Sequence, residues 1–185
     1  MARRSEVDWI AVGLGLLSQH GHTRLTVADL CARAGRTKGS LYHHYPRMDA
    51  FHAALLGAWR ERHTSRLIDE AEREARVDDK IRVLDTLADA LDLRLERAVR
   101  NWAAHDAPAR EAVQAVDRER VAYLARLRRE GGMTMAEAQD QATLAYALFL
   151  GLQQLLGQDE QAALRELAAR VEFVLPRAAR ERRNP

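Results

Sequence analysis

Side chains that donate hydrogen bonds are concentrated in one short stretch, residues 36–45. Thr37, Lys38 and Ser40 fall on what would be the first turn of a helix, where free backbone N–H groups and the positive helix end attract phosphate. Gly39 would allow close approach to a nucleic-acid backbone, and side chains one turn later can reach phosphates or base edges. The stretch therefore indicates nucleic-acid binding. The candidate contact residues are Arg36, Thr37, Lys38, Gly39, Ser40, Tyr42 and His43.

Catalytic chemistry has little support in the sequence. It contains no nucleophile elbow, no phosphate-cradling glycine loop and no paired His/Cys metal motif. His20 and His22 could be two metal ligands, but two ligands do not make a site and no third lies nearby. His43 and His44 are interpreted as packing and phosphate-contacting residues. We therefore expect no enzyme activity, no metal and no cofactor.

The composition of the 185-residue chain predicts an all-α fold. Strong helix formers (Ala, Leu, Arg and Glu) dominate, and only four prolines and ten glycines interrupt them. No stretch alternates apolar and polar residues over the length of a strand, and none has the roughly 18 apolar residues of a membrane span.

Positive charge is unevenly distributed along the chain, although the net charge is only +2. Residues 1–50 contain seven Arg or Lys against four Asp or Glu, a net of +3, whereas the remainder has 22 against 23, a net of −1. A modestly basic N-terminal part on a neutral body is consistent with a local phosphate-binding surface.

The cysteine and N-terminal patterns predict a cytoplasmic protein, nucleoid-associated when bound to DNA. The single cysteine, Cys31, excludes an intrachain disulfide and is interpreted as a small core residue. Arg3 and Arg4, ahead of the apolar residues from Trp9 to Leu17, resemble a twin-arginine export signal. Acidic residues interrupt the approach and no cleavage site follows, so export is disfavoured.

The first predicted helix extends from Ser5 to Gln19, with Ser5 in a capping box and Gly21 just after its end. It precedes the stretch that could bind nucleic acid. Its apolar side is expected to contain Val7, Ile10, Ala11, Leu14, Leu16 and Leu17.

The next two predicted helices have the spacing of a helix-turn-helix. One begins at Thr26, in a capping pattern with Asp29, and Gly35 ends it at a turn that favours positive φ. The other begins near Thr37 and stops before Pro46, because the residue before proline is pushed out of the α region. The expected packing anchors are Val27, Leu30, Cys31, Ala34 and Leu41.

Longer amphipathic helices are predicted after Arg47. Pro108 fits the first turn of one of them, Gly131-Gly132 ends it, and Thr134 with Glu137 forms a capping box for the next. One buried face is expected at Phe51, Leu55, Leu56, Trp59, Leu67 and Ile68. A second follows the helical period through Ile81, Leu84, Ala88, Leu91, Leu95, Val99 and Trp102.

The helix after Thr134 is apolar on every side from Leu144 to Leu152, so it needs cover on every side. Its own domain can cover one face, and a second subunit would cover the other. A last helix is expected over Glu160–Ala179. The expected dimer interface is a four-helix bundle of these two helices from each subunit, built on Leu144, Leu148, Leu152, Leu155, Leu164, Leu167 and Val171.

Residues 8–56 resemble the DNA-binding signature of the tetracycline-repressor (TetR) family. The likeness rests on residues 25–35 and on residues 37–45, above all on the run from Gly39 to Tyr45. The rest of the chain resembles the family only in length, helix order and an apolar penultimate helix.

The resemblance implies a homodimer that binds a double-stranded DNA operator and is released by a small-molecule effector. It implies a DNA-binding domain at residues 1–46 and an effector-binding and dimerisation domain at residues 47–185. It adds Thr26 to the DNA contacts and places Leu41 and Tyr45 inward. Family members commonly have a lysine where this chain has Met48, and Arg47 is the candidate substitute.

An effector pocket in the C-terminal domain would be mostly apolar, with few polar groups to orient the ligand. Its candidate residues are Trp59, Trp102, His105, Tyr123, Tyr146, Phe149 and Gln153. For any single aromatic residue among them, a place in a solid core is the favoured interpretation, whereas as a set they could line a pocket.

Two alternatives to an effector-controlled regulator remain. One is a helical-bundle enzyme or ligand carrier whose N-terminal unit makes protein contacts, which predicts no salt-sensitive DNA binding. The other is an architectural DNA-binding protein without an effector, which would be indifferent to small molecules. The sequence names neither the effector nor the operator, and it favours repression over activation only by resemblance.

Overall fold

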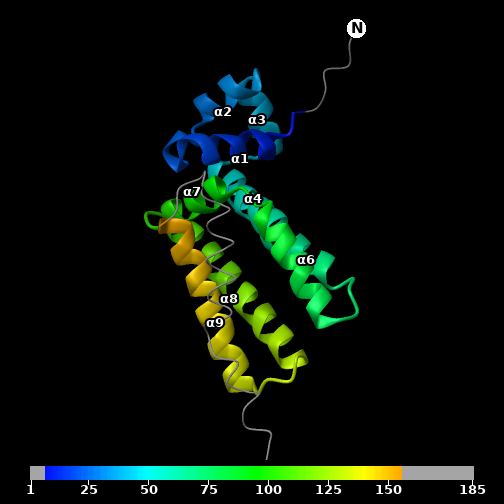
Figure 1. Cartoon of the computed structure of the whole chain (residues 1–185). Coiled ribbons are helices and arrows are strands. Elements are labelled where there is room, and N and C mark those ends of the chain that lie inside the picture. The colour runs from blue at the N-terminus through cyan, green and yellow to red at the C-terminus, as the bar shows by residue number, and fades with distance from the viewer. Residues whose placement is uncertain (1–6, 156–185) are drawn as a thin grey trace, which may run out of the picture. The chain divides into compact units, whose positions relative to one another are not determined.

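The computed structural model describes residues 7–155, which form helices joined by turns (Figure 1). The all-α prediction is confirmed. The N-terminal elements are α1 (Trp9–His20), η1 (His22–Arg24), α2 (Val27–Ala34), α3 (Lys38–His44), α4 (Met48–Arg60) and the π-helical turn η2 (Glu61–Ser65). They are followed by α5 (Arg66–Ala71), α6 (Val77–Asp89), α7 (Leu93–Ala103), α8 (Ala107–Glu130) and α9 (Met135–Leu155).

Most predicted helix ends are found where the capping residues indicated. Thr26 caps α2 and Thr37 caps α3, each through its side-chain oxygen. Gly21 and Gly35 follow α1 and α2 with positive φ angles of 78° and 60°. Thr134 and Glu137 form a reciprocal capping box before α9. Local sequence therefore determines these boundaries.

The start of the first helix differs from the prediction. The helix begins at Trp9, and Asp8 caps it by accepting a hydrogen bond from the backbone N–H of Ala11 (2.9 Å). Ser5 lies outside the described residues. Trp9, which the predicted apolar side omitted, is buried, whereas Ala11, which it included, is exposed.

The chain forms two compact units, each built from two segments of sequence. The first unit comprises residues up to Arg66 together with Asp92–Val116, and the second comprises Leu67–Leu91 together with the described residues from Asp117 onward. These units are defined by packing. The functional division after residue 46 stays a prediction.

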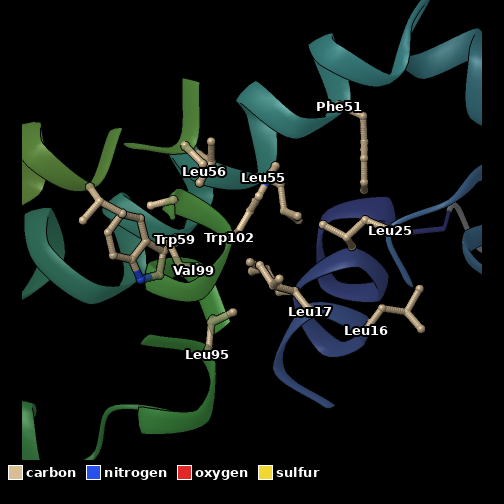
Figure 2. Packing of buried hydrophobic residues seen from close by; sticks show 14 of the residues in the cluster. Leu16, Leu17, Leu25, Phe51, Leu55, Leu56, Trp59, Leu95, Val99 and Trp102 are labelled. Carbon is tan, nitrogen blue, oxygen red and sulfur yellow. The ribbon is translucent and has the colours of Figure 1, made fainter. Parts of the chain in front are cut away.

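The core of the first unit is formed where α1, α4 and α7 meet, and Figure 2 shows their side chains converging. Leu17 of α1, Leu55 and Trp59 of α4, and Val99 of α7 are fully buried, and Trp102 is nearly so. Burying a large apolar side chain contributes roughly 1.5–3 kcal/mol. This core supports the helix-turn-helix from the side of α1.

A buried carboxyl group joins α4 and η2 to α7. Oε1 of Glu96 accepts a hydrogen bond from Trp59 Nε1 (2.9 Å) and lies 2.9 Å from Nδ1 of His63. Glu96 is fully buried, and His63 is 6 % exposed. The sequence predicted one helix with a buried face from Phe51 to Ile68, whereas η2 interrupts it.

The break between α6 and α7 was not predicted, because the helical period of apolar residues continues across it. Asp92 caps α7 with Oδ1, which accepts from the backbone N–H groups of Arg94 (3.0 Å) and Leu95 (3.1 Å). Its Oδ2 accepts a hydrogen bond from the hydroxyl of Ser18 in α1 (2.9 Å). One side chain therefore starts α7 and attaches it to α1.

Charged side chains surround the small core of the second unit, which contains Tyr123 and Leu127. Lys80 Nζ lies 3.1 Å from Glu72 and 3.3 Å from Glu130. Hydrogen bonding to Glu72 raises the pKa of Lys80, and a hydrogen bond donated by Tyr123 lowers the pKa of Glu72. These interactions join α6 and α8 to the residue that follows α5.

Helix α9 has one buried side and one exposed apolar side. Ala142 and Tyr146 are buried, and Tyr146 donates a hydrogen bond to Asp117 of α8 (2.6 Å). Leu144 is 53 % exposed and Leu155 is 81 % exposed. Of the other predicted interface residues, Leu148 is half-buried and Leu152 is buried, while Leu164, Leu167 and Val171 lie outside the described residues, as does the predicted last helix. Within residues 7–155, every helix is too short or too polar to cross a membrane.

Gly13 allows α4 to approach α1 closely, and we predict opposite effects for two glycine-to-alanine substitutions. A Cβ atom at Gly13 would lie 2.6 Å from Phe51 Cζ and 2.8 Å from Leu55 Cδ1, in a core where both side chains are fully buried. Overpacking costs about 1–3 kcal/mol, so Gly13→Ala should lower the melting temperature by roughly 2–10 °C.

Gly57→Ala is the matched control, since no atom lies within 4 Å of a Cβ at that helical position. It should raise the melting temperature by a few degrees, because alanine is favoured over glycine in a helix by about 1 kcal/mol. Equal increases in both variants would contradict the close packing. Thermal unfolding followed by circular dichroism measures both.

Candidate nucleic-acid interface

The predicted helix-turn-helix is formed by α2, a turn at Gly35 and α3. The backbone N–H of Gly35 bonds to the carbonyl of Ala32 (3.3 Å), and that of Arg36 bonds to the carbonyl of Cys31 (3.1 Å). Leu30 and Leu41 are fully buried, one from each helix. These two anchors and the left-handed glycine determine how α3 leaves α2.

One side of α3 faces the core and the other carries the predicted contact residues. Leu41 lies on the buried side of the helix. Lys38, Gly39 and His43 are exposed, and Tyr42 is 44 % exposed. Thr37 and Ser40 occupy the first turn, where the Thr37 hydroxyl accepts from the Ser40 backbone N–H (3.4 Å). Arg36, just before the cap, is half-buried.

The predicted contact Thr26 already uses its hydroxyl within α2. The hydroxyl accepts from the backbone N–H of Asp29 (3.1 Å) and donates to Asp29 Oδ2 (2.7 Å). Asp29 Oδ1 in turn accepts a hydrogen bond from Arg24 Nη2 (2.7 Å). Arg24 is absent from the predicted contacts, and its one sequence feature is a basic residue two positions before the capping pair of Thr26 and Asp29.

Arg47 precedes α4 and forms an ion pair with Asp49 (3.0 Å). The two side chains are 78 % and 66 % exposed, so the pair contributes little to stability and leaves the guanidinium accessible. Its role as a substitute for a lysine at the position of Met48 stays a prediction.

The C-terminal end of α3 is held against α4 by an aromatic pair. The rings of Tyr45 and Phe51 are 5.1 Å apart in an edge-on arrangement. Burial raises the pKa of Tyr45, and the negative charge of Asp8 raises it further. Tyr45 therefore points inward, as the resemblance implied, and joins α3 to the core of the first unit.

Comparison with known proteins supports the helix-turn-helix geometry. Residues 10–55 match the model of the bacterial regulatory proteins of the tetR family. Residues 10–55 therefore form an N-terminal domain of the TetR type. A comparison with curated protein sequences finds no match. In a helix-turn-helix the second helix is the recognition helix, and α3 occupies that position here.

Solved structures extend the likeness beyond this domain. A transcriptional regulator from Cytophaga hutchinsonii ATCC 33406 superposes with a TM-score of 0.67 at 12 % identity, covering 90 % of this chain and 93 % of that one. A proposed regulator from Pseudomonas aeruginosa PAO1 gives 0.67 at 22 % identity, covering 90 % and 89 %. A third, from Streptomyces coelicolor A3(2), gives 0.63 at 21 %, covering 88 % and 95 %. At these identities, the likeness shows a shared fold.

The predicted effector-pocket residues are divided between the two units. Trp59, Trp102 and His105 belong to the first unit, where both tryptophans are core residues and His105 is exposed. The second unit contains Tyr123, Tyr146, Phe149 and Gln153. Gln153 is 1 % exposed, and its Nε2 has no hydrogen-bond partner among the described residues.

The histidine-rich segment after α1 packs against α7. The rings of His22 and Trp102 are stacked at 6.4 Å, and His22 and His105 are stacked at 6.0 Å. His20 is exposed. In the part of the chain that the structure describes, no group of three or more His, Cys, Asp or Glu residues could hold a metal ion.

His52 lies in the same cluster, with its ring edge-on to Trp102 at 5.0 Å. Its Nε2 is buried without a hydrogen-bond partner in residues 7–155. Burial lowers the pKa of His52, and the nearby His22 lowers it further. A hydrogen bond with the backbone of Leu25 and the charges of Asp106 and Asp49 oppose this decrease.

We therefore predict that His52 makes stability depend on pH below about 6.5, the ordinary histidine pKa. Because its folded pKa lies below the unfolded value, the unfolded state binds more protons in this window. Stability is then fully present above pH about 6.5 and decreases as the pH falls toward the folded pKa.

Urea unfolding at several pH values from about 5 to 8 measures this effect. His52→Phe keeps a ring beside Trp102 and should reduce the loss of stability at acid pH relative to the wild type. His20→Gln controls for the removal of an exposed imidazole. Identical pH profiles for the wild type and His52→Phe would contradict the prediction.

Proposed function

We propose that this TetR-family regulator is a homodimeric repressor that binds a palindromic operator and leaves it when a small-molecule effector binds. The observation that carries the proposal is the exposed, donor-rich side of α3, with Lys38 and Gly39 on its first turn and Tyr42 and His43 one turn later. Leu41 on the opposite side fixes the helix in the core. A recognition helix presents its N-terminal residues to the major groove in this way.

In a dimer, the two recognition helices would enter successive major grooves about 34–36 Å apart. Backbone contacts from Thr37, Ser40 and Arg47 would set the register, and longer side chains would reach base edges. The proposed contact set, still to be tested, is Thr26, Arg36, Thr37, Lys38, Gly39, Ser40, Tyr42, His43 and Arg47.

The exposed apolar side of α9 supports dimerisation. Leu144 and Leu155 are separated by 11 positions, which at about 100° per residue brings them to nearly the same side of the helix. Both are largely exposed, and Leu148 lies between them. A contiguous apolar stripe of this kind is typical of a protein–protein interface, and a second copy of the same helix is the partner we propose.

The buried amide of Gln153 supports an effector site in the second unit. An unsatisfied buried donor costs about 1–3 kcal/mol, which a ligand with a hydrogen-bond acceptor would recover. Phe149, whose ring stacks on Tyr146 at 6.3 Å, lies about one turn before Gln153 on α9. The effector would release DNA only to the extent that it binds the free state more tightly than the DNA-bound state.

Selection from random duplexes with the purified full-length chain tests DNA recognition. We expect enrichment of one palindrome, with affinity that falls steeply as salt rises. Lys38→Ala should weaken binding on the order of tenfold, because it removes a charge from the first turn of α3. Arg73→Ala is the control, since that side chain is 72 % exposed but belongs to the second unit.

No enrichment at low salt, repeated after denaturing and refolding the protein to strip any bound ligand, would overturn the proposed function. An equal loss in Lys38→Ala and Arg73→Ala would overturn the role of α3. Once the operator is known, small molecules can be screened for its release, and Gln153→Leu should weaken the response to an effective compound.

Sedimentation velocity tests the dimer. Leu144→Glu and Leu155→Glu should each shift the protein toward monomer, because a charge would be buried at the interface. Met135→Glu is the control. Met135 is also exposed (65 %), but it lies nine positions before Leu144 and so about 180° around the helix. A monomeric wild type, or dissociation only in Met135→Glu, would contradict the proposed interface.

A further inference from the structure

The first turn of α2 contains a small polar cluster that its capping role does not fully explain. Asp29 accepts hydrogen bonds from two sides, at Oδ2 from the Thr26 hydroxyl (2.7 Å) and at Oδ1 from Arg24 Nη2 (2.7 Å). The capping of α2 needs only the hydrogen bonds between Thr26 and Asp29. The contact with Arg24 instead fixes a guanidinium group beside the start of α2.

The position of Arg24 follows from the turn that precedes it. Residues 22–24 form the short helix η1, and the next residue, Leu25, is 5 % exposed and anchors the segment in the core. The side chain of Arg24 is 61 % exposed and is directed to Asp29 from this fixed backbone. An arginine held in one orientation loses less conformational freedom when it binds a second group.

The contact with Asp29 does not use all the N–H donors of the Arg24 guanidinium group. Arginine carries five N–H donors, and the contact with Asp29 uses Nη2. The planar group matches the geometry of a phosphate, which can accept two parallel hydrogen bonds. In a helix-turn-helix, the helix before the recognition helix crosses the DNA backbone, so the start of α2 is where a phosphate is expected.

The charge of Asp29 gives a second reason for Arg24. A carboxylate on the first turn of α2 would repel a DNA phosphate unless a cation compensates it. Thr26, the predicted contact at this helix end, has its hydroxyl hydrogen committed to Asp29. Arg24 compensates the negative charge of Asp29. It also offers a DNA phosphate the hydrogen-bond donors that Thr26 cannot offer.

We propose that Arg24 contacts a DNA phosphate at the start of α2 and that Asp29 positions its guanidinium group. This inference rests on the proposed DNA-binding function and adds a contact outside the recognition helix. Arg24 contributes affinity to any duplex and carries no sequence preference, because it binds the backbone.

The salt dependence of DNA binding by the full-length chain tests the proposal. In Arg24→Ala, the slope of log K against log salt concentration should decrease by about 1.8, because the dimer loses one phosphate contact of about 0.9 from each subunit. Affinity near ~0.15 M salt should then fall about thirtyfold, equally for the operator and for a random duplex. Arg24→Lys keeps the charge and should restore the slope.

Arg66→Ala is a closely matched control. Arg66 is 68 % exposed and pairs with Glu61 five positions away, as Arg24 pairs with Asp29 five positions away. It should leave both slope and affinity unchanged. The double variant Arg24→Ala/Asp29→Asn should regain part of the affinity lost in Arg24→Ala, because it removes an uncompensated negative charge while an amide oxygen can still accept from Thr26.

The outcomes separate this inference from the proposed function. Binding that depends on Lys38 but has the same salt slope in Arg24→Ala and Arg66→Ala overturns the phosphate contact alone. Absence of salt-dependent binding by the wild type overturns the proposed function and the contact with it. A melting temperature of Arg24→Ala close to the wild-type value, with a reduced slope, supports a direct contact rather than a stabilising ion pair.

Discussion

The packing of α1 against α4 and α7 is the contact on which the DNA-binding helices depend. A three-helix unit this small buries too little surface to be stable by itself, so the outer side of α1 has to be covered. Leu17 and Leu55 are fully buried in this contact, and Val99 supplies the opposing surface from α7. The orientation of α3 is therefore supported by residues that lie far from it in the sequence.

Polar contacts make that packing specific. The hydrogen bond from Ser18 to Asp92 fixes the start of α7 on α1, and the stack of His22 on Trp102 fixes its other end. Glu96 joins the middle of α7 to α4 and η2. Apolar surfaces can slide past one another, whereas the hydrogen bonds at Glu96, which are buried, require one register. A change in the position of α7 would consequently be transmitted to α1 and α4 together.

The sequence was sufficient for features that depend on neighbouring residues. The caps at Thr26, Thr37 and Thr134 and the glycine at position 35 were predictable, because a cap or a left-handed turn is determined within a few residues. The start of α1 was misassigned because Asp8, interpreted from the sequence as the partner of Ser5 in a capping box, is itself the residue that caps the helix.

Features that depend on distant residues could not be predicted in the same way. In the sequence, nothing distinguishes Gly13 from other helical glycines, because its contact with Phe51 forms only in the fold. The apolar period likewise does not indicate the break between helices that Asp92 introduces. The exposed donors of α3 were predictable from a local motif. Arg24 was not, because its importance depends on a contact with Asp29 that only the folded turn creates.

The divided sequence of the first unit has a consequence for how the protein folds during synthesis. Ser18 and Asp92 are separated by 74 positions, and Leu67–Leu91, which belong to the other unit, are synthesised between them. The nascent chain thus completes its recognition helix long before α7 leaves the ribosome to cover Leu17 and Trp59. Until then, these apolar side chains are open to chaperones or to aggregation, and the high contact order of the closing step should make folding slow for an all-helical protein.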